Sequence, residues 1–255
     1  MSIILIVILS RKGNEFIIEL FLILCLSLSC LMHTFSRYLL YIPREPDFNK
    51  NICITQAFII IWFEMSTYIY ATLITFYIHL KVIKNFIEEN KKLISSVILT
   101  IGYVPSLIFA TLGKRADYFG PNKIRCIIKN KEVDDAGCII YYWTNAGIII
   151  MLVVVNIIFT IQLKVRFKSN KLEDQTQKDN FYFKQLNSYT VITILSFLPT
   201  IVYRIALNYD MYTDVLSFMS VFFNSIQGFL YAFTTLLYSG LIKKVKELID
   251  KYRIS

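Results

Sequence analysis

The chain has 255 residues, of which 56% are hydrophobic and 15% aromatic, and its formal net charge is +9. A soluble domain of this length would not need such long apolar runs, so the composition excludes that class and predicts a polytopic membrane protein with one bundle. Most basic residues lie between the apolar runs, where they orient helices and contact anionic lipid head groups. We therefore expect membrane lipid, and no nucleic acid, among its partners.

The first apolar run, residues 1–10, is too short to cross a bilayer alone. Ten helical residues span about 15 Å, against a hydrocarbon core of about 30 Å. Arg11 and Lys12 follow the run instead of preceding it, and no small-residue cleavage site is evident. These features favour the end of a shortened first transmembrane helix over a signal peptide. The second run covers residues 16–42 and ends at Pro43.

The third run, Cys53 to Lys84, is long enough to cross a bilayer and contains the carboxylate Glu64. A charged group at that depth needs a partner or a polar cavity. At 100° per residue, the polar side chains of this run share about 140° of arc. They are Glu64, Thr67, Tyr68, Thr72, Thr75 and His79. We predict that this stripe faces other helices.

Four further apolar runs complete the chain, separated by two polar stretches and a short turn around Asn208 to Asp210. The stretches are 113–137 and 164–185, and the runs are 93–112, 138–163, 189–207 and 213–241. With the N-terminus outside, most Lys and Arg residues fall on the inner side, as the positive-inside rule requires. We expect an all-α, seven-transmembrane bundle with a shortened first helix, forming one domain over residues 1–255. Residues 240–255 are predicted to be a cytoplasmic amphipathic tail.

The sixth and seventh runs also carry polar stripes. In the sixth run the stripe is Thr193, Ser196, Thr200, Tyr203 and Arg204, around Pro199 as a kink and hinge. In the seventh run it is Ser217, Ser220, Asn224, Gln227, Tyr231, Thr234, Thr235 and Tyr238. Hydrogen bonds between helices and a role in ligand binding or activation both explain such stripes.

Arg204 lies near the outer end of the sixth run, and Glu64 lies about 16 Å below Cys53 along its helix. The two side chains either pair in an outward-opening cavity, or Arg204 extends to the lipid head groups and leaves Glu64 protonated.

The five cysteines divide by position. Cys25 and Cys30 lie within an apolar run and are predicted to be core residues. Cys53 and Cys126 both fall on the outer, oxidising side, where a bridge would tie the loop over the bundle. Cys138 is the competing partner.

Motifs of enzymes and metal sites are missing from the sequence. His33 and His79 have no HExxH, Cys-x-x-Cys or carboxylate cluster beside them, and no GxSxG or phosphate-binding glycine loop is present. We expect no enzyme activity, no cofactor and no metal site.

Together these features resemble the cyclic-AMP-receptor-like group of G-protein-coupled receptors, a group similar to the secretin and adhesion receptors. The shared features include the seven runs, the cysteine at the start of the third, and the proline of the sixth. The loop phrase NKIRCIIKN and the last-run phrase FNSIQGFLYAFTTLLYSG complete the resemblance. It covers roughly residues 14–245 and includes the seventh-helix Q-G-F phrase of that group, at Gln227, Gly228 and Phe229.

The resemblance implies a multi-pass receptor of the plasma membrane, with no catalytic site, that responds to an extracellular ligand and activates a heterotrimeric G protein. Cys53 and Cys126 match the conserved bridge of such receptors, and Asn224, Gln227 and Gly228 match the seventh-helix activation region. Arg125 replaces the aromatic residue that often precedes the loop cysteine. The basic character of this loop suits an anionic ligand.

We expect a bundle with two conformations. Ligand contacts at Glu64, Tyr203 and Arg204 would bias the sixth helix about Pro199. That motion would open an inner cleft bordered by Lys81, Lys84 and the 164–184 loop. A small transporter or channel is the alternative, because polar stripes also line permeation paths. A receptor remnant that does not signal is a further alternative, because a half-length first helix would weaken the bundle.

Overall fold

The computed structural model describes residues 17–39, 50–84, 91–122, 125–128, 136–169, 177–208 and 214–238. Within these ranges the chain forms α2 (Ile17–Leu39), α3 (Lys50–Lys84), α4 (Lys91–Arg115), α5 (Ala136–Ser169), α6 (Gln177–Asn208) and α7 (Asp214–Tyr238), with strands β1 (Phe119–Asn122) and β2 (Arg125–Ile128). The predicted first run and the tail from 240 lie outside the described residues. The described part is almost entirely helical, as predicted.

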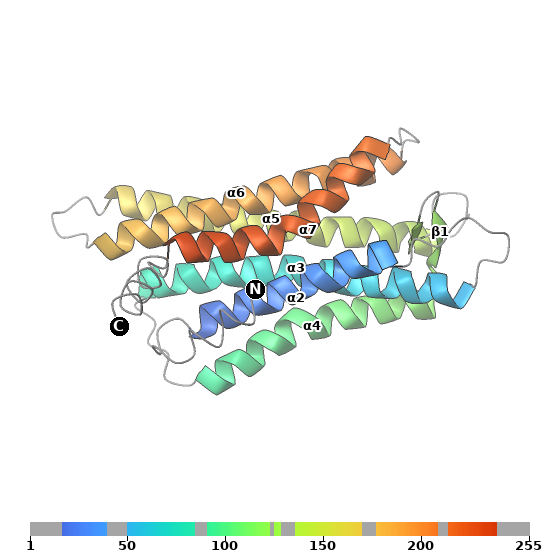
Figure 1. The fold of residues 1–255 in the computed structure, drawn as a ribbon, viewed down its shortest axis with the longest axis horizontal. Helices are drawn as coiled ribbons and strands as arrows, with labels where there is room; N and C mark the ends of the chain where they lie inside the picture. Colours follow the sequence, from blue (N-terminus) through green and yellow to red (C-terminus); the bar gives the residue numbers. More distant parts are fainter. Residues whose placement is uncertain are drawn as a thin grey trace, which may run out of the picture.

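The helices run along one common long direction, and α3 lies at their centre (Figure 1). It contacts α2, α4, α5, α6 and both strands. On one side of it α7 packs between α2 and α6, and α4 and α5 complete the other side. Because α3 has neighbours on most sides, its apolar residues Ile61 and Ile74 are fully buried. Of its polar stripe, Glu64, Thr67, Tyr68 and Thr75 are buried, whereas Thr72 and His79 are partly exposed.

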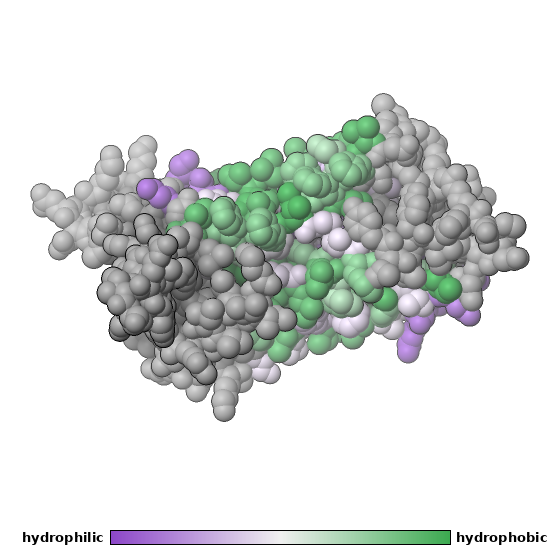
Figure 2. Space-filling model, viewed as in Figure 1, coloured by the Kyte–Doolittle hydropathy of each residue, from purple (hydrophilic) through white to green (hydrophobic). Residues whose placement is uncertain are grey.

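Among the described residues, three helices are long and apolar enough to cross a membrane, within Lys50–Leu80, Ser96–Arg115 and Ala136–Gln162. The most apolar window of α3 is 67% buried inside the protein, compared with 28% for α4 and 22% for α5. Apolar side chains cover the middle of the visible face, and hydrophilic ones lie toward its ends (Figure 2). This surface is suited to lipid around the outer helices, with α3 shielded from it.

Most helices extend beyond the apolar runs that predicted them. α5 continues to Ser169, and α6 begins at Gln177, well before the sixth run starts at Tyr189. Helical backbone bonds are satisfied within the helix in water as in lipid, so polar residues can prolong a spanning helix past the bilayer. The stretches predicted as loops are correspondingly shorter.

The polar stretch 113–137 contains an antiparallel hairpin that the sequence pattern does not predict. β1 pairs with β2 in a register that places Phe119 opposite Ile128 and Pro121 opposite Cys126. Asp117, with φ of 55°, makes the left-handed turn that leads from α4 into β1. We call the end of the bundle that carries this hairpin the hairpin end.

Candidate functional site

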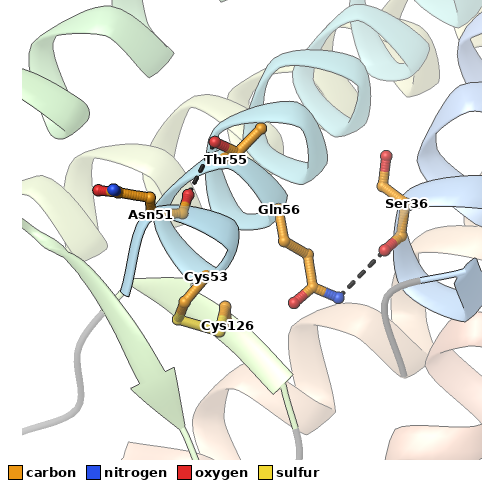
Figure 3. Close-up of a disulfide and its surroundings, with 6 residues drawn as sticks. All are labelled: Ser36, Asn51, Cys53, Thr55, Gln56 and Cys126. Carbon is orange, nitrogen blue, oxygen red and sulfur yellow. Dashed lines mark hydrogen bonds between the residues drawn. A yellow bond between two sulfur atoms is a disulfide. The ribbon is translucent and has the colours of Figure 1, made fainter. Parts of the chain in front are cut away.

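A disulfide fastens the hairpin to the first turns of α3. Cys53 and Cys126 are bonded, with their Cα atoms 5.1 Å apart, which confirms the predicted bridge (Figure 3). Both residues are buried in an apolar cluster with Phe119 and Ile128 of the hairpin. The competing partner, Cys138, lies in this cluster but outside the bridge. The predicted core residues Cys25 and Cys30 are buried.

Tyr141 of α5 supports the hairpin from below. Its ring stacks on Phe109 of α4 at a centroid distance of 4.4 Å, and its hydroxyl donates to the Phe109 carbonyl at 2.8 Å. Gly113 makes room for it, because a Cβ there would lie 2.5 Å from the Tyr141 oxygen. The hairpin therefore covers the ends of α3, α4 and α5.

On the other side of α3, at the same end, Gln56 joins α3 to α2. Its Nε2 donates to the backbone carbonyl of Ser36 at 3.1 Å (Figure 3). The Gln56 side chain is buried, so this hydrogen bond holds α2 and α3 together at the hairpin end.

Glu64 is buried in the interior, with 1% of its surface exposed. The Tyr68 hydroxyl, one turn along α3, donates to its Oε1 at 3.4 Å. The Tyr68 ring in turn packs on Phe197 of α6, with centroids 4.2 Å apart. The carboxyl group is therefore linked through Tyr68 to the middle of α6.

The other two predicted ligand contacts lie further along α6 toward the hairpin end. Tyr203 is buried. The side chain of Arg204 lies outside the described residues, as do those of Lys81 and Lys84 at the opposite end of α3. The sites predicted at these cationic residues stay predictions.

Direct hydrogen bonds connect α6 to α7 along the predicted stripes. Asn224 donates through Nδ2 to the Thr200 hydroxyl at 2.9 Å, and Thr200 also bonds the Ser220 hydroxyl at 3.1 Å. Further along, Thr193 bonds the Tyr231 hydroxyl, and Tyr189 bonds Thr235. The rings of Tyr189 and Tyr231 stack at 4.6 Å with an interplanar angle of 8°.

The predicted stripe of α7 faces the protein wherever its side chains are described. The members with described side chains are all buried: Ser220, Asn224, Gln227, Tyr231, Thr234 and Thr235. Hydrogen bonds between helices account for several of them, which was one of the two explanations for the stripe.

Gly228 allows α7 to approach α2 closely. A Cβ at this position would lie 3.0 Å from the Ser27 Cα and 3.3 Å from Cys30. Ser27 donates to the Gly228 carbonyl at 3.5 Å, and Thr34 donates to Ser225 at 3.0 Å in the same interface. A side chain at residue 228 would push the two helices apart.

Several contacts of α3 and α4 escape sequence reasoning. Gly102 lies against the Tyr70 ring, the Trp62 indole donates to the Tyr103 carbonyl at 3.2 Å, and Ser66 bonds Ser106 at 2.8 Å. The sequence signal for them is weak: small residues on two apolar helices, which favour close packing in a membrane.

Two buried contacts tie α5 into the half of the bundle away from the hairpin. Asn156 donates to the Thr72 hydroxyl at 2.9 Å, and Thr160 bonds Thr190 of α6 at 2.5 Å. Among the described residues, no group of three His, Cys, Asp or Glu could hold a metal ion.

The chain matches a protein-family model. The model described as 7 transmembrane receptor (Secretin family) matches residues 2–231. No curated protein matches the chain. The matched range includes the helices, the hairpin and the disulfide, and it ends at Tyr231 within α7.

Proposed function

Because the chain belongs to the secretin family of seven-transmembrane receptors, we propose that it is a G-protein-coupled receptor of the cyclic-AMP-receptor-like type, located in the plasma membrane. The family match over residues 2–231 is the observation that carries this proposal. The receptor would form one domain with seven crossings, with residues 1–10 forming the end of the first and 240–255 forming a cytoplasmic tail. Its partners would be an extracellular ligand, a heterotrimeric G protein and membrane lipid.

The buried carboxyl group of Glu64 supports a ligand site below the hairpin end. It is linked through Tyr68 to Phe197 of α6, so a ligand group that bonds Glu64 would act on α6. Tyr203 is buried further along the same helix. We propose Glu64, Tyr203 and Arg204 as ligand contacts, and an anionic ligand that is attracted by the basic loop.

Pro199 supplies the bend for the conformational change. Proline has no N–H, so the carbonyl four residues earlier, at Leu195, loses its helical partner and α6 is weakened there. The part of α6 before Pro199, at the end away from the hairpin, would swing to open an inner cleft bordered by Lys81, Lys84 and the segment 164–184 that joins α5 to α6, where the G protein would bind. Asn224, Gln227 and Gly228 would couple α7 to this motion.

Membrane topology is the first test. Epitope tags at both ends, probed with antibodies before and after permeabilisation, should place the N-terminus outside and the C-terminus inside. Both termini on the inner side would contradict the seven crossings, and a receptor mechanism with them.

Signalling is the second test. Membranes containing the receptor and a heterotrimeric G protein should accelerate nucleotide exchange when candidate anionic agonists, cyclic AMP first, are added. Gln227→Leu should abolish this acceleration at normal surface expression. Unchanged exchange in that variant would refute the role proposed for α7.

A transporter is the competing proposal, since buried polar residues on α3, α6 and α7 could line a path. The direct bonds Thr193 to Tyr231 and Tyr189 to Thr235 close the space between α6 and α7, which supports the receptor instead. Solute flux in reconstituted vesicles, without any nucleotide exchange, would favour the transporter.

A further inference from the structure

The polar contacts between α6 and α7 follow one antiparallel register. Each step forward along α6 is matched by an equal step back along α7. We call this series of contacts the ladder and each hydrogen-bonded pair a rung. The three rungs are Thr200 with Asn224, Thr193 with Tyr231, and Tyr189 with Thr235. Any other residue on the inward face of α6 can therefore be assigned an opposite position on α7.

One rung of this ladder has polar side chains but no bond between them. Ser196 lies between Thr193 and Thr200, and the register places it opposite Gly228, next to Gln227. Ser196 and Gln227 are 1% and 0% exposed. Within the described part of the chain, the Ser196 hydroxyl and both amide atoms of Gln227 make no hydrogen bond, and neither does Oδ1 of Asn224.

The nearest hydroxyl does not complete this rung. Tyr231 lies close to the Gln227 amide, but no hydrogen bond of acceptable geometry joins them. The Tyr231 oxygen is already bonded to Thr193 and to the Tyr189 carbonyl. The Thr200 hydroxyl is similarly occupied by Ser220 and Asn224.

Roughly 90% or more of buried polar groups in proteins are hydrogen-bonded, to protein or to ordered water. Ser196, Gln227 and Asn224 lie within about one helical turn of each other by this register, and a small molecule that both donates and accepts hydrogen bonds could satisfy all three side chains. We propose that a water molecule is bound between α6 and α7 at this level. It accepts from the Ser196 hydroxyl and donates to Oε1 of Gln227 and Oδ1 of Asn224, giving the three bonds usual for a buried water.

This water site lies one turn from Pro199, where α6 lacks a backbone bond. Direct side-chain hydrogen bonds join α6 to α7 on both sides of the water site. At the water site itself, near Pro199, the two helices are joined through an exchangeable water molecule. When α6 bends, the water can exchange partners, and the direct rungs need not break. The assignment goes beyond the proposed receptor function, because it requires no agonist and no G protein.

The first test uses hydroxyl radicals generated by an X-ray pulse in the purified wild-type protein. Radicals formed from a bound water label the side chains beside it. Tyr231 should be oxidised several-fold more than Phe119, since both are buried to within 1% exposure but only Tyr231 adjoins the water site. Equal labelling of the two residues would overturn the proposal.

The second test measures the melting temperature of the purified protein in detergent, without ligand. If water bridges the groups, Ser196→Ala and Gln227→Met should each lower it, and the double variant should fall by less than the sum, because both changes remove the same molecule. Ser29→Ala, in the α2 to α4 interface, should be additive with Ser196→Ala.

Two results of the second test would overturn the proposal. Variants that melt at or above the wild-type temperature would mean that the polar groups have no bound partner, since removing an unpaired buried group is neutral or stabilising. A wild-type melting temperature that rises with sodium but not with choline would identify a cation instead of water.

Discussion

The contact between Gly102 of α4 and Tyr70 of α3 predicts a large effect from one added methyl group. A Cβ at Gly102 would lie 2.1 Å from the Tyr70 Cζ, 2.4 Å from its oxygen and 2.5 Å from Cε1. Carbon atoms pack at about 3.5 to 4.0 Å. The ring would therefore have to move by more than about 1 Å.

Tyr70 has little freedom to make that movement. It is fully buried in the largest apolar cluster, and its ring meets Tyr103 edge-on at a centroid distance of 5.1 Å. Overpacking of this kind costs about 1 to 3 kcal/mol, and we expect the upper end. Replacing glycine by alanine within a helix gains about 0.5 to 1 kcal/mol, so Gly102→Ala should lose about 2 kcal/mol.

That loss corresponds to a fall of about 4 to 8 °C in melting temperature for a domain of this size. It can be measured with a dye that fluoresces on reaction with thiols, because Cys25 and Cys30 are buried in the folded protein and become accessible on unfolding. Gly147→Ala on α5 is the matched control. A Cβ there meets nothing within 4 Å, so this variant should be neutral or slightly more stable.

A compensating variant separates the steric clash from other causes. Tyr70→Leu removes the ring, so adding Gly102→Ala to it should cost less than in the wild type. If Gly102→Ala melts like Gly147→Ala, the close approach of α3 and α4 described above is wrong.

Three other substitutions test separate parts of the structure. Cys53→Ser opens a bridge that encloses a sequence separation of 73 residues; it should cost at most about 4 kcal/mol, and equal melting with and without reductant in the wild type would contradict this. Thr193→Val removes one of the two hydrogen bonds of the Tyr231 hydroxyl, which still bonds the Tyr189 carbonyl, and should cost about 0.5 to 1.5 kcal/mol; in the Tyr231→Phe background the cost should shrink, and an unchanged cost would refute the pairing. Glu64→Gln keeps an acceptor for Tyr68 and should melt near the wild-type temperature, while Glu64→Leu should melt lower; the reverse order would refute the bond.

The polar stripes could be predicted because the bilayer makes a polar side chain expensive anywhere but the interior. Ser220 and Gln227 are buried for that reason. The topology places Cys53, Cys126 and Cys138 at the outer side and so predicts a bridge there, and the resemblance to known receptors favours the pair Cys53 and Cys126 that the structure contains. Both inferences depend on the solvent that surrounds the chain and need no knowledge of which helices touch.

Contacts between particular helices could not be predicted in this way. Tyr70 against Gly102 depends on the separation and rotation of two helices, and a hydrophobic pattern specifies neither. The pattern also cannot distinguish an apolar residue that faces lipid from one that faces protein, so the burial of Ile61 on α3 was not foreseen. Strands of four residues, as in the hairpin, are too short to show alternation.

The position of the hairpin makes the bundle unequal from side to side at that end. Phe119 and Ile128 are sealed against α3, α4 and α5 by a covalent bond and by the ring of Tyr141. A molecule that descends from this end toward Glu64 meets peptide on that side. Among the described residues the hairpin packs on α3 and on Tyr141 of α5, so chemical probes for a ligand of the proposed site should first be attached along α2, α6 and α7.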